Sequence, residues 1–136
     1  MFSEDKMRLE VLQKIEACRE ITTIDLENMN IVDNEILEIV QKIKLIQPSV
    51  SVINLDNNDL SDKGAMILAK YVPDFHHLTE LSLQFNQIGK EGALGVFGLK
   101  KGLAALDILF HGNKIIDQGE MAAIERVAIK HAGRSI

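Results

Sequence analysis

Residues 50–64 read VSVINLDNNDLSDKG, and this stretch contains a pattern of apolar and polar residues that recurs in the chain. Counting Val50 as position one, apolar residues stand at positions one, four, six and eleven. An asparagine stands at position nine, an aspartate at thirteen and a glycine at fifteen. We call these numbered positions the frame, and here its residues are Val50, Ile53, Leu55, Asn58, Leu60, Asp62 and Gly64.

Three further copies of the frame follow the same order. The copy that starts at residue 78 contains Leu78, Leu81, Leu83, Asn86, Ile88 and Gly92. The copy that starts at residue 105 contains Ala105, Ile108, Phe110, Asn113, Ile115, Asp117 and Gly119. A weaker copy at residue 21 contains Ile21, Ile24, Leu26, Ile31 and Asp33. The starts are 29, 28 and 27 residues apart, and self-similarity at such a period indicates stacked repeats.

The pattern L-x-x-L-x-L-x-x-N-x-L, followed by an amphipathic helix, resembles the leucine-rich repeat. The length of 27 to 29 residues and the D-x-G before the helix resemble the ribonuclease-inhibitor-like subfamily. The resemblance covers about residues 21–131. It implies a short α/β solenoid of about four repeats, with a parallel sheet on the concave side and helices on the convex side.

The expected organisation is a single leucine-rich-repeat domain over residues 1–136. Residues 1–20 form an N-terminal capping helix, the repeats span 21–49, 50–77, 78–104 and 105–131, and 132–136 is a tail. The family's asparagine satisfies backbone groups of the turn after each strand, because it carries both a donor and an acceptor. Met29 and Glu35 stand where the first repeat should have asparagine and glycine, which fits a terminal position with one neighbour fewer.

Apolar spacing predicts which helix faces point inward. Residues 3–19 read as a helix with Ser3 as N-cap and an apolar stripe of Met7, Val11, Ile15 and Cys18. This apolar stripe must be covered, and the natural role of the helix is to cap the first repeat. The inward stripes of the next helices are Ile36, Ile39, Val40 and Ile43; then Ala65, Leu68, Ala69 and Val72; then Ala93, Val96 and Phe97.

Composition narrows the possible partners. The formal net charge of −5 disfavours nucleic acid and anionic membranes, both of which are held by basic patches. The longest apolar runs are too short to span a bilayer, and the N-terminus MFSEDKMRLE lacks the pattern of a signal peptide. One cysteine cannot form an internal disulfide. We therefore expect a cytoplasmic protein, or one delivered into a host cytosol if it is a bacterial effector.

The residues do not form a recognisable catalytic arrangement, so we predict no enzyme activity, no catalytic residue, no cofactor and no metal site. Cys18 lies on a buried stripe, where a structural thiol is expected. His76 and His77 are adjacent in a loop, and neighbouring histidines rarely ligate one metal ion. His111 near Asp107 lacks the third group that would orient a catalytic pair.

Residues between the inward leucines should face the concave surface, because side chains alternate along a strand. Five of the twelve are acidic and none is Lys or Arg: Thr23, Asp25, Glu27, Val52, Asn54, Asp56, Glu80, Ser82, Gln84, Asp107, Leu109 and His111. Phe85 is expected at the rim beside them. We predict that a partner binds at Asp25, Glu27, Asn54, Asp56, Glu80, Ser82, Gln84, Phe85, Asp107, Leu109 and His111. A solvated acidic face without a partner is the alternative interpretation.

Proteins that resemble this subfamily mostly recognise other proteins, so the resemblance implies a non-catalytic interaction module. The module would bind, and inhibit or position, another protein that presents a basic surface. An accessory protein of the GTPase-activating type is one alternative, although no arginine lies on the predicted face. A structural protein that self-associates through the strand edge of the fourth repeat or through the convex helices is another, with a monomer favoured.

Overall fold

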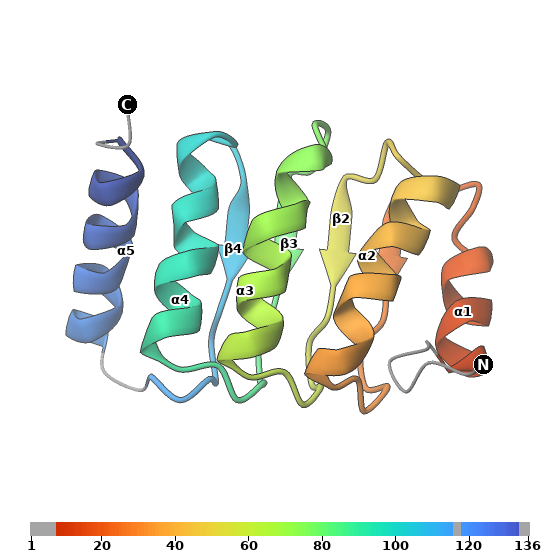
Figure 1. Cartoon of the computed structure of the whole chain (residues 1–136), viewed down its shortest axis with the longest axis horizontal. Helices are drawn as coiled ribbons and strands as arrows, with labels where there is room; N and C mark the ends of the chain where they lie inside the picture. The colour runs from red at the N-terminus through yellow and green to blue at the C-terminus, as the bar shows by residue number, and fades with distance from the viewer. Residues whose placement is uncertain (1–7, 116–117, 134–136) are drawn as a thin grey trace.

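The computed structural model describes residues 8–115 and 118–133. Helices and strands alternate along the chain (Figure 1), and short 3-10 helices extend two of the helices. The order is α1 (Leu9–Glu16), β1 (Thr23–Asp25), α2 (Asp33–Ile46), β2 (Val52–Asn54), α3 (Asp62–Tyr71), η1 (Val72–Asp74), β3 (Glu80–Ser82), α4 (Lys90–Phe97), η2 (Gly98–Lys101), β4 (Asp107–Leu109) and α5 (Gln118–Gly133). This is the α/β solenoid predicted from the frame.

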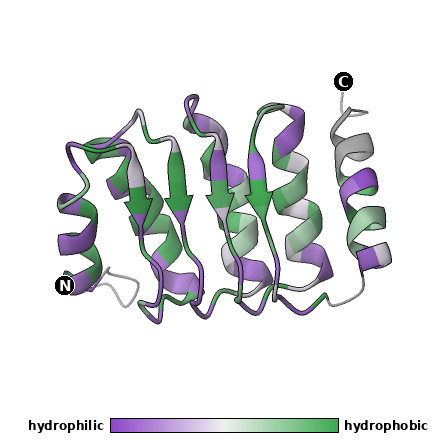
Figure 2. Cartoon of the chain, turned by 180° about the vertical axis from the view of Figure 1, so that it is seen from behind, coloured by the Kyte–Doolittle hydropathy of each residue, from purple (hydrophilic) through white to green (hydrophobic). Residues whose placement is uncertain are grey.

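The four strands form one parallel sheet in the order β1-β2-β3-β4. Thr23 pairs with Val52, Val52 with Glu80, and Glu80 with Asp107, so equal frame positions lie side by side across the sheet. The helices form a layer on one side of the sheet, and the strands are in front when the molecule is seen from the other side (Figure 2). Within residues 8–115 and 118–133, the helices cover one face of the sheet and leave the other open for contacts with other molecules.

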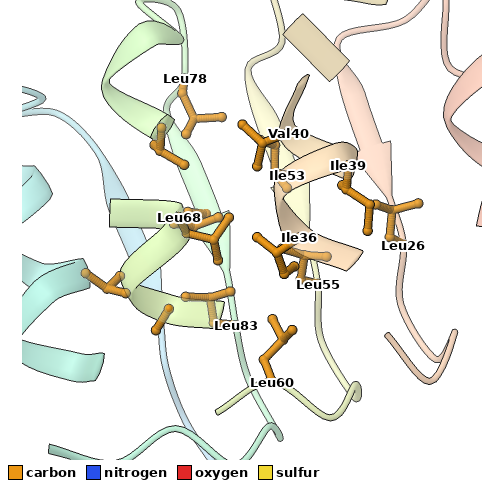
Figure 3. Close-up of a cluster of buried hydrophobic side chains, with 14 of the residues drawn as sticks. Leu26, Ile36, Ile39, Val40, Ile53, Leu55, Leu60, Leu68, Leu78 and Leu83 are labelled. Carbon is orange, nitrogen blue, oxygen red and sulfur yellow. The ribbon is translucent and has the colours of Figure 1, made fainter. Parts of the chain in front are cut away.

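The core lies between the sheet and the helices. Each strand contributes its central residue, and Ile24, Ile53 and Leu81 are fully or almost fully buried. In the close-up, Ile36 of α2 and Leu68 of α3 lie among Ile53 of β2 and leucines from the segments that flank the strands (Figure 3). The predicted inward stripes are confirmed, with Ala69 half-buried and the other ten residues buried. Ser3 and Met7 lie outside the described residues, whereas Val11, Ile15 and Cys18 are buried as expected.

Position one of the frame is buried in the second and third repeats but exposed in the first and fourth. Ile21 is exposed because β1 is an edge strand without a preceding strand on its flank. Ala105 is also exposed, and Leu106 is buried in its place. The Leu106 N–H donates to Leu103 O as the Leu78 N–H donates to Phe75 O, so the fourth repeat is one residue shorter before its strand. Asp117 lies outside the described residues.

The asparagines at position nine connect neighbouring repeats. Asn58 accepts hydrogen bonds from the N–H groups of Met29 and Ile31 and donates to Leu26 O in the preceding repeat. Asn86 and Asn113 make the corresponding bonds to their own preceding repeats, and all three asparagines are buried. The predicted role of this residue is confirmed.

The aspartates at position thirteen connect the helices. Oδ1 of Asp33 accepts hydrogen bonds from the N–H groups of Ser61 and Gly64, both at 2.9 Å, at the start of α3. Asp62 binds Gly89 and Gly92 at the start of α4 in the same way. Each carboxylate therefore caps the helix of the following repeat, where free N–H groups favour negative charge.

The first repeat caps its own helix differently. Oε1 of Glu35 accepts a hydrogen bond of 3.1 Å from the Val32 N–H, which is the frame equivalent of the Ser61 and Gly89 N–H groups. Arg8 donates from Nε and Nη2 to the two oxygens of Glu35, at 2.8 and 3.2 Å, and from Nη2 to Met29 O. Its hydrogen bond to Glu35 raises the pKa of the guanidinium above the ordinary value. Glu35 thus supplies the carboxylate that a preceding repeat supplies elsewhere.

Candidate functional site

The open side of the sheet carries the candidate site. We call the residues at frame positions three, five and seven the strand face: Thr23, Asp25, Glu27, Val52, Asn54, Asp56, Glu80, Ser82, Gln84, Asp107, Leu109 and His111. Their neighbours at positions four and six point into the core, and this alternation places the strand face toward the open side. Asp107, Leu109 and His111 are exposed, whereas Asp56 and Ser82 are buried.

Several polar residues of the strand face bind groups of the chain itself. Asp56, only 9% exposed, accepts hydrogen bonds from Ser82 Oγ at 2.6 Å and from the Gln84 N–H at 2.8 Å. Asn54 Oδ1 accepts from the Asp56 N–H, and Asp25 Oδ1 accepts from the Glu27 N–H. These side chains hold the turns after the strands. A carboxylate with such partners is a structural acceptor rather than a free charge.

The remaining acidic side chains of the strand face are more accessible. Glu27 and Asp107 are exposed, and Glu80 is half-buried. Glu80 and Asp107 are register partners on β3 and β4, so two negative charges stand side by side on strands about 4.8 Å apart. Like charges at paired positions destabilise a sheet. This pair therefore creates a local negative potential and lowers the stability of the sheet.

An aromatic group lies beside these charges. Phe85 follows β3 and is 50% exposed. Its ring meets the His111 ring edge to face, with centroids 6.0 Å apart and planes at 86°. The ring also lies over the backbone of Gly112, where a Cβ atom would come within 2.3 Å of Phe85 Cδ1. Leu109, 38% exposed, extends this apolar area on the strand face.

The backbone at Phe85 is left-handed. Frame position eight has φ of 58° at Asn28, 55° at Asn57, 57° at Phe85 and 79° at Gly112. The N–H groups of the first three all donate to a carbonyl of the next repeat, so one turn geometry recurs. Asparagine and glycine tolerate this conformation, but a bulky aromatic residue there is a strained outlier that costs about 1 kcal/mol or more. Sequence reasoning missed this, although Asn, Asn and Gly at position eight signal a left-handed turn.

The remaining candidate groups are the two adjacent loop histidines and the single cysteine. His76 and His77 are exposed, and Cys18 is buried with its Sγ donating to Lys14 O. Across residues 8–115 and 118–133, no three His, Cys, Asp or Glu side chains come together in a way that could hold a metal ion. In the same part of the chain, no helix has the length and apolar character needed to cross a bilayer.

Comparison with known proteins agrees with this architecture. A family model described as Leucine Rich repeat matches residues 47–69 and 76–97. A search of curated proteins finds no significant match. Among solved structures, "Leiomodin-1 Actin-Binding Site 2 (ABS2)" has a TM-score of 0.66 and 19% sequence identity, with 90% of this chain and 85% of that chain covered.

The likeness at 19% identity concerns the fold alone, and the family model matches the second and third copies of the frame. Both agree with the alternating helices and the four parallel strands of the described residues. The chain is therefore a short α/β solenoid, two of whose repeats match the leucine-rich-repeat family model.

Proposed function

We propose that the chain is a non-catalytic module that binds a basic segment of another protein through its strand face. The observation that carries the proposal is the uniform sign of the charge on this face. Its accessible ionised groups include Glu27, Glu80 and Asp107, and none of its twelve positions holds Lys or Arg. A surface of one sign attracts a partner of the opposite sign and fixes how it docks.

The like-charged pair supports this assignment. Glu80 and Asp107 repel each other in the free protein, and a Lys or Arg side chain placed between them would offset that repulsion. A sheet whose residues served only stability would favour opposite charges at paired positions. A bound cation would therefore offset the repulsion between Glu80 and Asp107 that destabilises the isolated fold.

The size of the sheet bounds what can bind. Four strands spaced by about 4.8 Å span about 15 Å, which accommodates one segment of a partner and cannot encircle a globular protein. A module of this size inhibits or positions its partner by covering one local surface.

The similar solved structure is, by its title, an actin-binding site, which is consistent with protein binding by this fold. The repeat length also favours the ribonuclease-inhibitor-like subfamily.

Affinity purification from the native source tests the proposal. The baits are wild type, E80K/D107K and a control, E91K/E120K, which changes the net charge equally at exposed positions on α4 and α5. Asp56 is left unchanged because its hydrogen bonds hold the turn after β3. We expect one partner to be recovered with wild type and the control and lost with E80K/D107K. Equal recovery with all three baits would refute the proposal.

A further inference from the structure

The strongest unexplained feature outside the charged residues is the conformation of Phe85. The same left-handed turn occurs in the first two repeats with Asn28 and Asn57, so the turn itself does not require an aromatic residue. Half of Phe85 is exposed, so burial in the core does not explain it either. Backbone strain that the fold does not need points to a role in function.

The surroundings of Phe85 hold the ring in a fixed place. One side of the ring lies over Gly112, whose missing side chain leaves the space that the ring occupies. The ring edge meets His111, and the Phe85 N–H donates to His111 O at 2.8 Å. Large aromatic side chains that are held rigidly and stay partly exposed are typical of binding hot spots, because little conformational entropy is lost on binding.

We infer that Phe85, with Leu109 and His111, is the apolar anchor of the strand face. This inference rests on the proposed function and specifies the partner further. The basic side chain of the partner would lie at Glu80 and Asp107, four frame positions from His111. Since an extended chain rises about 3.3 Å per residue and β4 ends at Leu109, the acidic pair and His111 are at most about 13 Å apart. The fitting occupant is an extended segment with Lys or Arg four residues from a large apolar residue.

The substitution Phe85→Asn tests the anchor without damage to the turn, because asparagine adopts the same φ in the first two repeats. We expect the melting temperature of F85N to be unchanged or higher by up to about 4 °C. The control Asn28→Phe places an aromatic residue at the equivalent strained position of the first repeat. It should lower the melting temperature and leave binding at the third and fourth repeats unchanged.

Binding is measured with a displayed library of random 12-residue peptides, selected on wild type. Peptides that bind should combine Lys or Arg with a large apolar residue four positions away, and synthetic copies should bind F85N at least about tenfold more weakly than wild type and N28F. Basic peptides that bind F85N as tightly as wild type would overturn the anchor and leave the proposed function standing. Selected peptides without basic residues would contradict the proposed function itself. A clear loss of thermal stability in F85N would show that Phe85 supports the fold and would also overturn the anchor.

Discussion

Single carboxylates fix the junctions between the inner repeats. Asp33 binds Ser61 and Gly64, and this contact explains why position fifteen holds glycine. A Cβ atom on Gly64 would come within 2.3 Å of Asp33 Oδ1. The glycine therefore makes room for the carboxylate of the preceding repeat, which is a more specific reason than crowding at the start of the helix.

The substitution Gly64→Ala tests this contact. The added methyl group displaces the Asp33 carboxylate and leaves helix N–H groups without their acceptor, so the free energy of unfolding should fall by about 1–3 kcal/mol. This loss should outweigh the gain of about 1 kcal/mol that alanine brings inside a helix. Urea denaturation at equilibrium measures the difference.

Gly98→Ala is the matched control for that experiment. No atom lies within 4 Å of a Cβ built on Gly98, and its φ of −63° suits any residue. The free energy of unfolding of the Gly98→Ala variant should stay the same or rise by about 0.4–1 kcal/mol. Similar effects of the two substitutions would contradict the explanation that position 64 is glycine because it leaves room for the Asp33 carboxylate.

Residue roles divide into those that the sequence reveals and those that it does not. The role of Asn58 was predictable because an amide offers a donor and an acceptor within one repeat period. The partner of Asp33 was not, because its hydrogen bonds reach 28 to 31 residues along the chain and the spacing does not say which way a carboxylate points. Asp56 was predicted as a binding charge, but it is buried and binds Ser82 on β3 and Gln84 just after that strand.

At the scale of elements, the ion pair between Arg8 and Glu35 joins the N-terminal segment to α2, and we call this pair the clamp. Glu35 is 8% exposed at its side chain and Arg8 is 37% exposed, so the ion pair is only partly screened by water. Glu35 departs from the frame in the repeat whose strand, β1, forms one edge of the sheet. Its pairing with Arg8 was not predictable, because Arg8 occupied an unremarkable position in the predicted capping helix and lies 27 residues away.

A double-mutant cycle with Arg8→Met and Glu35→Met measures this clamp. Arg8→Met leaves a buried carboxylate with fewer partners and should cost about 1–3 kcal/mol of stability. The double variant should lose less than the sum of the single variants, with a coupling of at least about 1 kcal/mol.

The Lys44–Asp74 pair provides the comparison for the clamp. Its atoms are 3.0 Å apart, but both side chains are more than half exposed. A corresponding cycle on this pair should give a coupling near or below about 0.5 kcal/mol, because exposed ion pairs contribute little. Additive single substitutions at Arg8 and Glu35 would show that the clamp does not stabilise the first repeat.

At the scale of the whole molecule, each repeat contacts mainly its neighbours, so stability should vary along the stack. α2 buries six side chains, whereas the described side chains of α5 up to residue 128 include two buried ones, Ile124 and Ala128. An open pocket of about 400 Å³ is lined by residues of β4, of the segment after it and of α5, among them Ile108, Phe110 and Met121. α5 should therefore open more readily than the inner helices.

Native-state hydrogen exchange tests this gradient. Amides of α5 should exchange at least about tenfold faster than those of α2 and α3, because local opening needs less free energy where few apolar contacts are lost. Exchange in α5 as slow as in α3 would mean that the stack opens as a single unit.

The overall architecture was the most predictable level, because four copies of one frame specify parallel strands in sequence order. The acidic character of the strand face also followed from the alternation of side chains along each strand. Phe85 was predicted to bind a partner together with Leu109 and His111, but its strain was not, since the strain depends on a backbone angle that neighbouring repeats share with different residues.

The central claim is that the strand face receives a basic partner segment. The most direct measurement is NMR chemical-shift mapping of the isotope-labelled chain, titrated with a basic peptide recovered from the displayed library. We predict the largest shifts at the amides of β3 and β4 and at Phe85 and His111, with the exposed faces of α2, α3 and α4 unaffected. Shifts concentrated on those helices, with β3 and β4 unchanged, would contradict the claim.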